Sequence, residues 1–460
     1  MSDRVLKRRI AGWMLFDWAS QPFYTSLWTF IFAPFFAITA TQMFMAQGMT
    51  ENAADAQAQS LWSAGQMITG LIIAFSAPFL GAIADSSGRR RPWIALFSIL
   101  LFVGAWGTWF TVPDGSTIML GLVMLSIGFI GAEFATIFTN SYLPSLGNHT
   151  QIGKISGNGF AIGYAGGFVA LAVSLAVFAQ TAAGTTFAGL QIPFGLNPDA
   201  MEGTRAVGPF VAIWFAIFMV PFFLWVHDEK TNGKSQEKTS VVADLKASLA
   251  KVIKSRSTSA YLLSAMFYRD ALNALYAFGG TYAALVLNWS VPQIGAFGVI
   301  AVITAAIFTW LGGELDTRFG PKPVIVVCVL LLIVVSAIIV GMSREQLFGI
   351  TFAEGSSMPD KIFYLCGAIN GAVGGILQSA SRTMMVRHAD PDRPTEAFGL
   401  YALSGKGTAF LAPALITAFT LMSGSVRHGF LPVIALFLIG LVLLIWVKPE
   451  GDRAAWSKSS

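Results

Sequence analysis

Long apolar runs separated by short polar segments make up most of this 460-residue chain. A helix needs about 20 consecutive apolar residues to cross the hydrocarbon core of a bilayer. Twelve runs reach that length, and their approximate limits are 11–41, 60–84, 93–112, 117–140, 155–181, 206–227, 259–287, 291–315, 322–342, 359–384, 396–421 and 428–448. The pattern predicts an all-α membrane protein with twelve transmembrane helices. The first run is too long for a signal peptide, so we expect it to be a retained span.

One motif occurs twice, in residues 81–91 and again in residues 312–322. Each copy has a glycine, an aspartate four residues later, and then a glycine accompanied by positive charge. The two copies are half a chain apart, which indicates a duplicated structure. We therefore predict two pseudo-symmetric six-helix bundles, 1–227 and 259–460, joined by a cytoplasmic linker over 228–258.

The positive charges predict the orientation of these spans. With the N-terminus inside, and with the span-end residues Lys322, Lys361 and Lys448 counted in their adjacent loops, 22 of the 29 Lys and Arg residues fall in cytoplasmic segments, 4 in external segments and 3 within spans. Because Lys and Arg accumulate on the cytoplasmic side, we expect both termini to be cytoplasmic. Within the linker, Val242, Leu245, Leu249, Val252 and Ile253 share one helical face, which predicts an amphipathic helix on the inner leaflet.

Composition excludes several classes of protein. The chain is 55% hydrophobic and 12% charged, against about 25% charged residues in a soluble domain. The net charge of +5 is spread over short loops, which does not indicate a nucleic-acid partner. Two cysteines, Cys328 and Cys366, lie in apolar runs and give neither a disulfide framework nor a zinc site. We expect no metal and no cofactor, and the compact loops favour a bacterial inner membrane.

Three segments carry a family resemblance: residues 13–20 (WMLFDWAS), 267–273 (FYRDALN) and 398–410 (FGLYALSGKGTAF). With the repeat and the twelve spans, they make the chain resemble the major facilitator superfamily, and within it the branch of vacuolar amino-acid effluxers and their bacterial relatives. The resemblance implies the major facilitator fold, a transport role, and a central cavity lined by spans one, four, seven and ten. It also supports a gating role for the loop motif, at Gly81, Asp85, Gly88, Arg89 and Asp316.

Charged residues inside the spans are the candidates for chemistry, because each costs about 2.5 to 3.5 kcal/mol on insertion scales. Carboxylates in a low dielectric can take up a proton, so Asp17, Glu133 and Asp270 are candidates for proton coupling. Arg269 and Lys406 are candidates for binding an anionic substrate group. Asn273, Asn370 and Gln378 could add neutral hydrogen bonds.

Structural roles compete with these assignments. Asp270 could instead pair with Lys406 or Arg382 as a bridge, and Arg382 is more simply explained by snorkelling to the interface. Arg269 and Asp270 are adjacent and lie about 100° apart around a helix, so we expect one to face the cavity and the other a neighbouring helix. Asp85 could cap a helix start across its loop and pair with Arg89 or Arg90.

A secondary active transporter working by alternating access is the function these features favour. We expect the solute to be small and zwitterionic or anionic, such as an amino acid or short peptide, and its transport to be coupled to protons. Sodium is the alternative coupling ion. An amphipathic lipid-like molecule is the alternative substrate. An enzyme is disfavoured because no nucleophile and base are grouped at one depth, and residues 399–408 match a P-loop only superficially. A receptor or scaffold would not need ionisable residues at mid-membrane. We expect a monomer whose partners are its solute, its coupling ion and membrane lipids.

Overall fold

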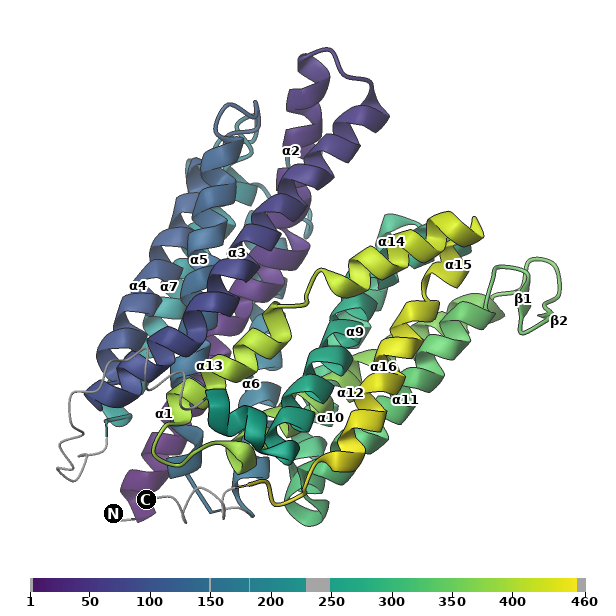
Figure 1. Cartoon of the computed structure of the whole chain (residues 1–460). Coiled ribbons are helices and arrows are strands. Elements are labelled where there is room, and N and C mark those ends of the chain that lie inside the picture. The colour runs from purple at the N-terminus through teal and green to yellow at the C-terminus, as the bar shows by residue number, and fades with distance from the viewer. Residues whose placement is uncertain (1–2, 149, 182, 229–248, 453–460) are drawn as a thin grey trace. The chain divides into compact units, whose positions relative to one another are not determined.

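The structure is a computed structural model that describes residues 3–148, 150–181, 183–228 and 249–452, and these are mostly helical (Figure 1). The first half of the chain contains α1 Asp3–Pro22, α2 Phe32–Ala46, α3 Glu51–Ser87, α4 Arg91–Gly107, α5 Ile118–Asn140, α6 Ile152–Val173 and α7 Glu202–Trp225. The second half contains α9 Arg256–Leu287, α10 Val291–Phe319, α11 Pro321–Gly341, α12 Met358–His388, α13 Pro394–Lys406, α14 Leu411–Ser423, α15 Val426–Gly429 and α16 Leu431–Leu443. Most of the predicted amphipathic helix in the linker lies outside the described residues.

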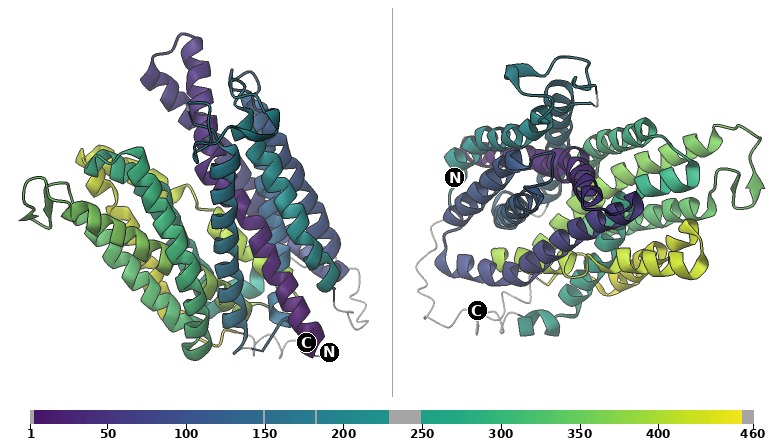
Figure 2. Two further views of the ribbon diagram at one scale, coloured as in Figure 1. Left: turned by 180° about the vertical axis from the view of Figure 1, so that it is seen from behind. Right: turned by 90° about the horizontal axis from the view of Figure 1, so that it is seen from above.

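Short irregular elements complete the fold. Strands β1 Gln346–Leu347 and β2 Ile350–Thr351 form an antiparallel hairpin between α11 and α12, visible at the edge of Figure 2. A π-helix, Phe23–Phe30, continues α1 directly after Pro22. Proline has no backbone N–H to donate, so the hydrogen-bond pattern of the first span changes at this residue.

Eleven helical segments of the described residues are long and apolar enough to cross a membrane. The segment that brings the number to the predicted twelve is α9, which has 32 residues but carries Arg269, Asp270 and Asn273 near its middle. Because polar groups inside a membrane helix are costly and usually functional, the polar centre of α9 is a candidate functional site.

Two compact units form from the chain. The first consists of Met1–Ile73, Ser87–Thr139 and Ile162–Asn232, and the second of Ala74–Ser86, Asn140–Ala161 and Gly233–Ser460. The second unit therefore includes two segments from the first half of the sequence, namely the end of α3 and the region from the α5–α6 connection into α6.

Glycines allow close helix contacts within the first unit. A Cβ atom built on Gly104 of α4 would lie 2.2 Å from the backbone nitrogen of Gly128 in α5, and one on Gly131 would lie 2.4 Å from that of Leu101. In α6, Gly163 lies against Asp17 of α1. Small residues at these positions let the helix backbones approach closely.

Glycines have the same role in the second unit, where α12 packs against α10. A Cβ atom built on Gly367 would lie 2.3 Å from the ring of Phe297, and one on Gly371 would lie 2.1 Å from the carbonyl oxygen of Ala301. Gly367 and Gly371, four residues apart on α12, thus form a contact surface between these two helices.

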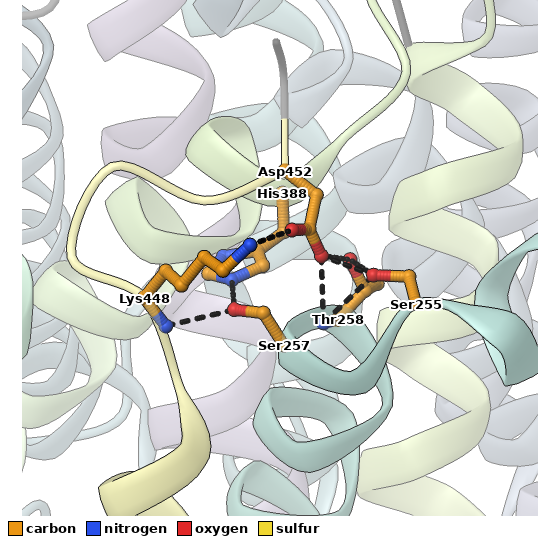
Figure 3. Close-up of polar contacts among 6 residues, drawn as sticks. All are labelled: Ser255, Ser257, Thr258, His388, Lys448 and Asp452. Carbon is orange, nitrogen blue, oxygen red and sulfur yellow. Dashed lines mark hydrogen bonds and ion pairs between the residues drawn. The ribbon is translucent and has the colours of Figure 1, made fainter. Parts of the chain in front are cut away.

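A polar clasp joins the start of α9 to the segment that follows α16 (Figure 3). Ser255 caps α9 and accepts a hydrogen bond from the backbone N–H of Thr258 (3.3 Å), and Asp452 accepts from the same N–H (3.2 Å) and from the Thr258 hydroxyl (3.0 Å). The backbone N–H of Lys448 donates to Ser257 (2.8 Å), whose hydroxyl also contacts Nε2 of His388 at the end of α12 (2.8 Å). Residues 448–452 are therefore held against two helices.

The charge of Asp452 contributes to this clasp. Burial raises the pKa of the Asp452 carboxyl, but hydrogen bonds from Ser255 and Thr258 outweigh burial and lower the pKa below its ordinary value. A group whose pKa is lower in the folded state stabilises that state above its unfolded pKa of about 3.9, and the stabilisation is lost as the pH falls through the folded value.

Replacing Gly131 by alanine should destabilise the first unit by about 1–3 kcal/mol, because the added methyl group would overlap the backbone of α4. Gly70→Ala is the matched control, since a Cβ atom there meets nothing within 4 Å. Thermal unfolding in detergent measures both variants. An unchanged unfolding temperature for Gly131→Ala would contradict the close α4–α5 contact.

Asp452→Ala should increase hydrogen exchange at the Thr258 amide about fivefold at pH 7, which corresponds to loss of a cap worth about 1 kcal/mol. The ratio between variant and wild type should stay constant down to about pH 4 and then fall towards one as Asp452 of the wild type becomes protonated. Exchange measured by mass spectrometry on peptides covering the start of α9 provides the readout, and Asp199→Ala, in an exposed loop, is the control. A ratio that does not depend on pH would show that the carboxylate charge plays no part.

Candidate functional site

The eleventh span is broken in its middle. The sequence predicts one helix over 396–421, but α13 ends at Lys406 and α14 begins at Leu411, with a non-helical link between them that is visible in Figure 1. Pro413 explains the difference, because it lacks an N–H and its ring would clash with the carbonyl of Ala409 in a continuous helix. Gly407 adds a residue of low helix propensity to the link.

Asp270 of α9 caps the second part of this broken span. Its Oδ2 accepts a hydrogen bond from the backbone N–H of Ala412 in the first turn of α14 (3.1 Å), while Oδ1 has no hydrogen-bond partner. The side chain is only 2% exposed. The partial positive charge of a helix N-terminus stabilises a carboxylate in this position.

Arg269, the preceding residue, contacts the first part of the span. Its Nη1 donates to the carbonyl oxygen of Tyr401 in α13 (3.0 Å), and the guanidinium carbon lies 4.1 Å from the centre of the Tyr401 ring. Gly405, one turn further along α13, leaves the space for the guanidinium, because a Cβ atom there would lie 2.5 Å from it. A cation over an aromatic ring is attracted by its negative face.

The two charges of α9 therefore point to different partners, as predicted from their 100° separation. Neither Arg269 nor Asp270 forms an ion pair with any described residue, so the alternative in which Asp270 bridges to Lys406 or Arg382 is wrong. The side chain of Arg269 is half-buried and that of Asp270 is buried. The cation is the member of the pair that solvent can reach.

Arg269 begins a polar stripe along α9. Asn273 and Tyr276 follow at intervals of four and three residues, which places all three on one helical face, and both of these side chains are exposed. The hydroxyl of Tyr276 lies over Gly374 of α12, 2.0 Å from a Cβ atom built there. The stripe thus runs from the break in the eleventh span to the contact with α12.

The other predicted binding residues lie around this stripe. Asn370, one turn from Gly374 on α12, is 6% exposed, and its Oδ1 accepts no hydrogen bond. Gln378, one turn on the other side of Gly374, is half-buried. Lys406 ends α13, where a cation matches the negative end of the helix dipole.

Asp17 and Glu133 belong to the first unit. Asp17 lies in α1 against Gly163, and Glu133 of α5 accepts a hydrogen bond from the hydroxyl of Tyr24 (3.4 Å). Both carboxylates are half-buried.

Asp85 lies at the start of α13. Its Oδ2 accepts a hydrogen bond from the backbone N–H of Glu396 (2.8 Å), and Gly81, one turn earlier, lets α3 approach, because a Cβ atom there would lie 2.7 Å from the carbonyl oxygen of Thr395. Asp85 caps a helix start as predicted, but the helix is α13. The backbone N–H groups of Arg90 and Arg91 at the start of α4 donate instead to Asp228 (3.2 and 3.3 Å).

The turn after α3 holds the rest of this motif. Gly88 has φ +63°, which favours glycine, and ends the helix. Arg89 is exposed, and its backbone N–H donates to the hydroxyl of Ser87 (3.3 Å). Its side chain forms no ion pair with any described residue, so of the two partners predicted for Asp85, Arg89 or Arg90, the first is wrong.

Asp316, the equivalent of Asp85 in the second copy of the motif, lies at the start of α6. A Cβ atom on Gly153 in the first turn of α6 would lie 2.7 Å from the carboxyl carbon of Asp316. An ion pair between Lys154 and Glu314 lies beside this contact. Both copies of the motif therefore bring a carboxylate to the first turn of a helix, but neither oxygen of Asp316 accepts a hydrogen bond from the described residues, whereas Asp85 accepts one.

Arg382 of α12 is buried rather than snorkelling, so the interfacial prediction is wrong. Its side chain donates from Nε to the Ser156 hydroxyl (2.9 Å), from Nη2 to the Ser156 carbonyl (2.7 Å) and from Nη1 to Oδ1 of Asn140 (3.2 Å). The guanidinium also lies 4.1 Å from the ring centre of Phe160. These contacts join α12 to the region around the start of α6.

Sequence reasoning missed two residues of the site, Tyr401 and Gly405. Their spacing of four residues places them on one face of α13, which was the available signal. It gave no indication of a partner on α9, because that contact depends on how the two helices are rotated.

Comparisons with known proteins agree with this architecture. The family described as "Vacuole effluxer Atg22 like" matches residues 6–455. The uncharacterized MFS-type transporter YxiO of Bacillus subtilis is 24% identical over 444 residues, covering 95% of this chain and 94% of the relative. Autophagy-related protein 22 of Cryptococcus neoformans is 24% identical over 319 residues, and this match spans only 53% of that protein.

Solved structures show the same fold. The fucose:proton symporter FucP of E. coli superposes with a TM-score of 0.69 at 14% identity, covering 96% of this chain and 99% of that one. The proton:xylose symporter XylE gives a TM-score of 0.69 at 13% identity and 98% coverage of both chains. Together with the twelve spans and the duplicated loop motif, the family match establishes that this chain is a major facilitator superfamily transporter and belongs to the vacuole effluxer Atg22-like family.

Proposed function

We propose that this transporter moves a small zwitterionic or anionic solute, such as an amino acid or short peptide, by alternating access coupled to protons. The observation that carries the proposal is Arg269, a half-buried cation in the middle of α9 that forms no ion pair with any described residue. An arginine fork presents several N–H donors to a carboxylate or phosphate, and only one donor of Arg269 is used by Tyr401.

The surroundings of Arg269 suit such a solute. Asn273 is exposed one turn along α9 and can donate or accept a hydrogen bond. Lys406 at the end of α13 adds a second cation, and Asn370 and Gln378 on α12 add amide groups. Mixed charge and neutral polar groups fit a zwitterion better than a purely apolar ligand.

Coupling to protons rests on Asp270. A carboxylate that is 2% exposed and that, among the described residues, has no cation as partner and leaves one oxygen without a hydrogen bond is costly while charged. Binding a proton removes that cost. Asp17 and Glu133 are the other candidates, and each is tested by its amide variant.

Gating by the repeated motif fits the contacts of Asp85 and Asp316. Each carboxylate lies at a helix N-terminus, where such a charge contributes about 0.3–1 kcal/mol. Contacts of that strength can bias an equilibrium between two conformations without locking it. Gly81 and Gly88 shape the first of these contacts, and Arg89, in the same loop, belongs to the proposed gate.

The cellular setting is part of the proposal. We infer a bacterial inner membrane, because the loops are compact and a relative that spans nearly the whole chain is from Bacillus subtilis. We further infer cytoplasmic termini from the charge distribution, and a monomer within the lipid.

Flux into proteoliposomes tests the function. Screening purified protein by thermal shift against amino acids, short peptides, sugars and lysolipids first selects the solute, and labelled solute is then followed under an imposed pH gradient. Stabilisation by lysolipids alone would overturn the small-solute proposal in favour of an amphipathic substrate.

Arg269→Ala should raise the KM for the selected solute roughly 10- to 100-fold, since a hydrogen bond to a charged group is worth about 1.5–3 kcal/mol. The KM of Arg269→Lys should lie between those of Arg269→Ala and the wild type, because lysine keeps the positive charge but lacks the several N–H donors of the guanidinium. Lys361→Ala, an exposed lysine at the start of α12, is the control. A KM unchanged in Arg269→Ala would remove this residue from the binding site.

Asp270→Asn should abolish accumulation driven by a pH gradient while leaving exchange of labelled for unlabelled solute within about threefold of the wild type. The amide keeps an acceptor for the Ala412 N–H but cannot take up a proton. Glu345→Gln, in an exposed loop, is the control. Undiminished gradient-driven accumulation would exclude Asp270, and the Asp17→Asn and Glu133→Gln variants would then show which carboxylate couples.

A further inference from the structure

Two adjacent residues of α9 hold the two parts of the eleventh span. Arg269 contacts α13 through the carbonyl and ring of Tyr401, and Asp270 contacts α14 through the N–H of Ala412. Between those contacts lies the non-helical link 407–410. The dipeptide therefore straddles the break.

The charges match the helix ends that they meet. The C-terminal part of α13 carries partial negative charge and meets a cation, whereas the N-terminal turn of α14 carries partial positive charge and meets a carboxylate. Reversing the two residues would place each charge against the wrong end. This match between side-chain charge and helix-end charge is what two residues that fix the ends of α13 and α14 would require.

Sterics add a second, independent fit. Gly405 lies so close to Arg269 that a methyl group there would lie 2.5 Å from the guanidinium carbon. The guanidinium is thus seated on α13 by a hydrogen bond, an aromatic face and the absence of a side chain. On the other side, the one hydrogen bond that the Asp270 carboxylate makes with the described residues goes to α14.

We propose that Arg269 and Asp270 are positioning residues that fix the bend of the eleventh span at 407–410. The competing explanation is that Pro413 and Gly407 produce the bend by themselves, with Arg269 and Asp270 as neighbours only. The proposal rests on the transport role proposed above and deepens it. If Arg269 binds the solute and Asp270 binds the proton, the same two residues connect both binding events to the bend of the eleventh span. Its test does not depend on transport, so the two can fail separately.

Distances between spin labels measure the bend. Labels are placed by Leu285→Cys and Leu421→Cys, two exposed positions near the ends of α9 and α14, after Cys328→Ala and Cys366→Ala remove the buried native thiols. Because α14 has 13 residues at a rise of about 1.5 Å each, a change of about 15° in the bend would move its end by about 5 Å. Distance distributions are recorded for the full-length protein in lipid nanodiscs.

Arg269→Ala and Asp270→Ala should each shift or broaden the distribution by about 5 Å, whereas Asp270→Asn, which keeps an acceptor for the cap, should match the wild type. Gly405→Ala should act like Arg269→Ala by displacing the guanidinium, and Gly295→Ala is its matched control because nothing lies within 4 Å of a Cβ atom there.

Wild-type distributions in Arg269→Ala, Asp270→Ala and Gly405→Ala would overturn the proposal and leave the bend to Pro413 and Gly407. A shift of equal size in Gly295→Ala would also overturn it, since the response would then be unspecific. Variants are compared only on the monodisperse fraction from size-exclusion chromatography. If Arg269→Ala or Asp270→Ala fails to fold, Gly405→Ala still tests the proposal, with Asp270→Asn as the variant expected to match the wild type.

Discussion

The hydrogen bond from the Ala412 N–H to the Asp270 carboxylate is the interaction on which the candidate site depends. The eleventh span is interrupted at mid-membrane, where water cannot satisfy the exposed groups of the new helix start. Asp270 supplies an acceptor from a different helix. Its neighbour Arg269 is consequently directed to the other part of the same span, and the exposed stripe of α9 follows from that orientation. The candidate site on α9 and the break in the eleventh span therefore depend on the same contacts of Arg269 and Asp270.

The two copies of the loop motif occupy similar places but differ in their contacts. Asp85 and Asp316, which occupy equivalent places in the two loop motifs, lie at the first turns of α13 and α6 within the second unit. Asp85 accepts a hydrogen bond from the backbone N–H of Glu396, whereas neither carboxylate oxygen of Asp316 accepts one from the described residues. Gly81 lies against the backbone of Thr395, and its equivalent Gly312 lies against the side chain of Ile376. The first copy of the motif is therefore a helix cap, and the second shares its position at a helix start without the hydrogen bond.

Sequence patterns predicted most of the scaffold because lipid imposes a simple length requirement on apolar runs. They also predicted that Arg269 and Asp270 diverge, since helical geometry alone fixes that angle. The break in the eleventh span was missed because the run over 396–421 as a whole is still long and apolar enough to cross a membrane, although Pro413 was a usable signal. The partner of Arg269 and the burial of Arg382 could not be predicted, because both depend on the rotation and tilt of packed helices.

The polar centre of α9 has a consequence for biogenesis. Two charged residues near the middle of one helix oppose its partition from the translocon into lipid by about 2.5–3.5 kcal/mol each. The groups that compensate them, around Tyr401 and Ala412, are synthesised more than a hundred residues later. Stable integration of α9 must therefore wait until the eleventh span has emerged from the ribosome, which makes late assembly of this bundle an inherent property of the sequence.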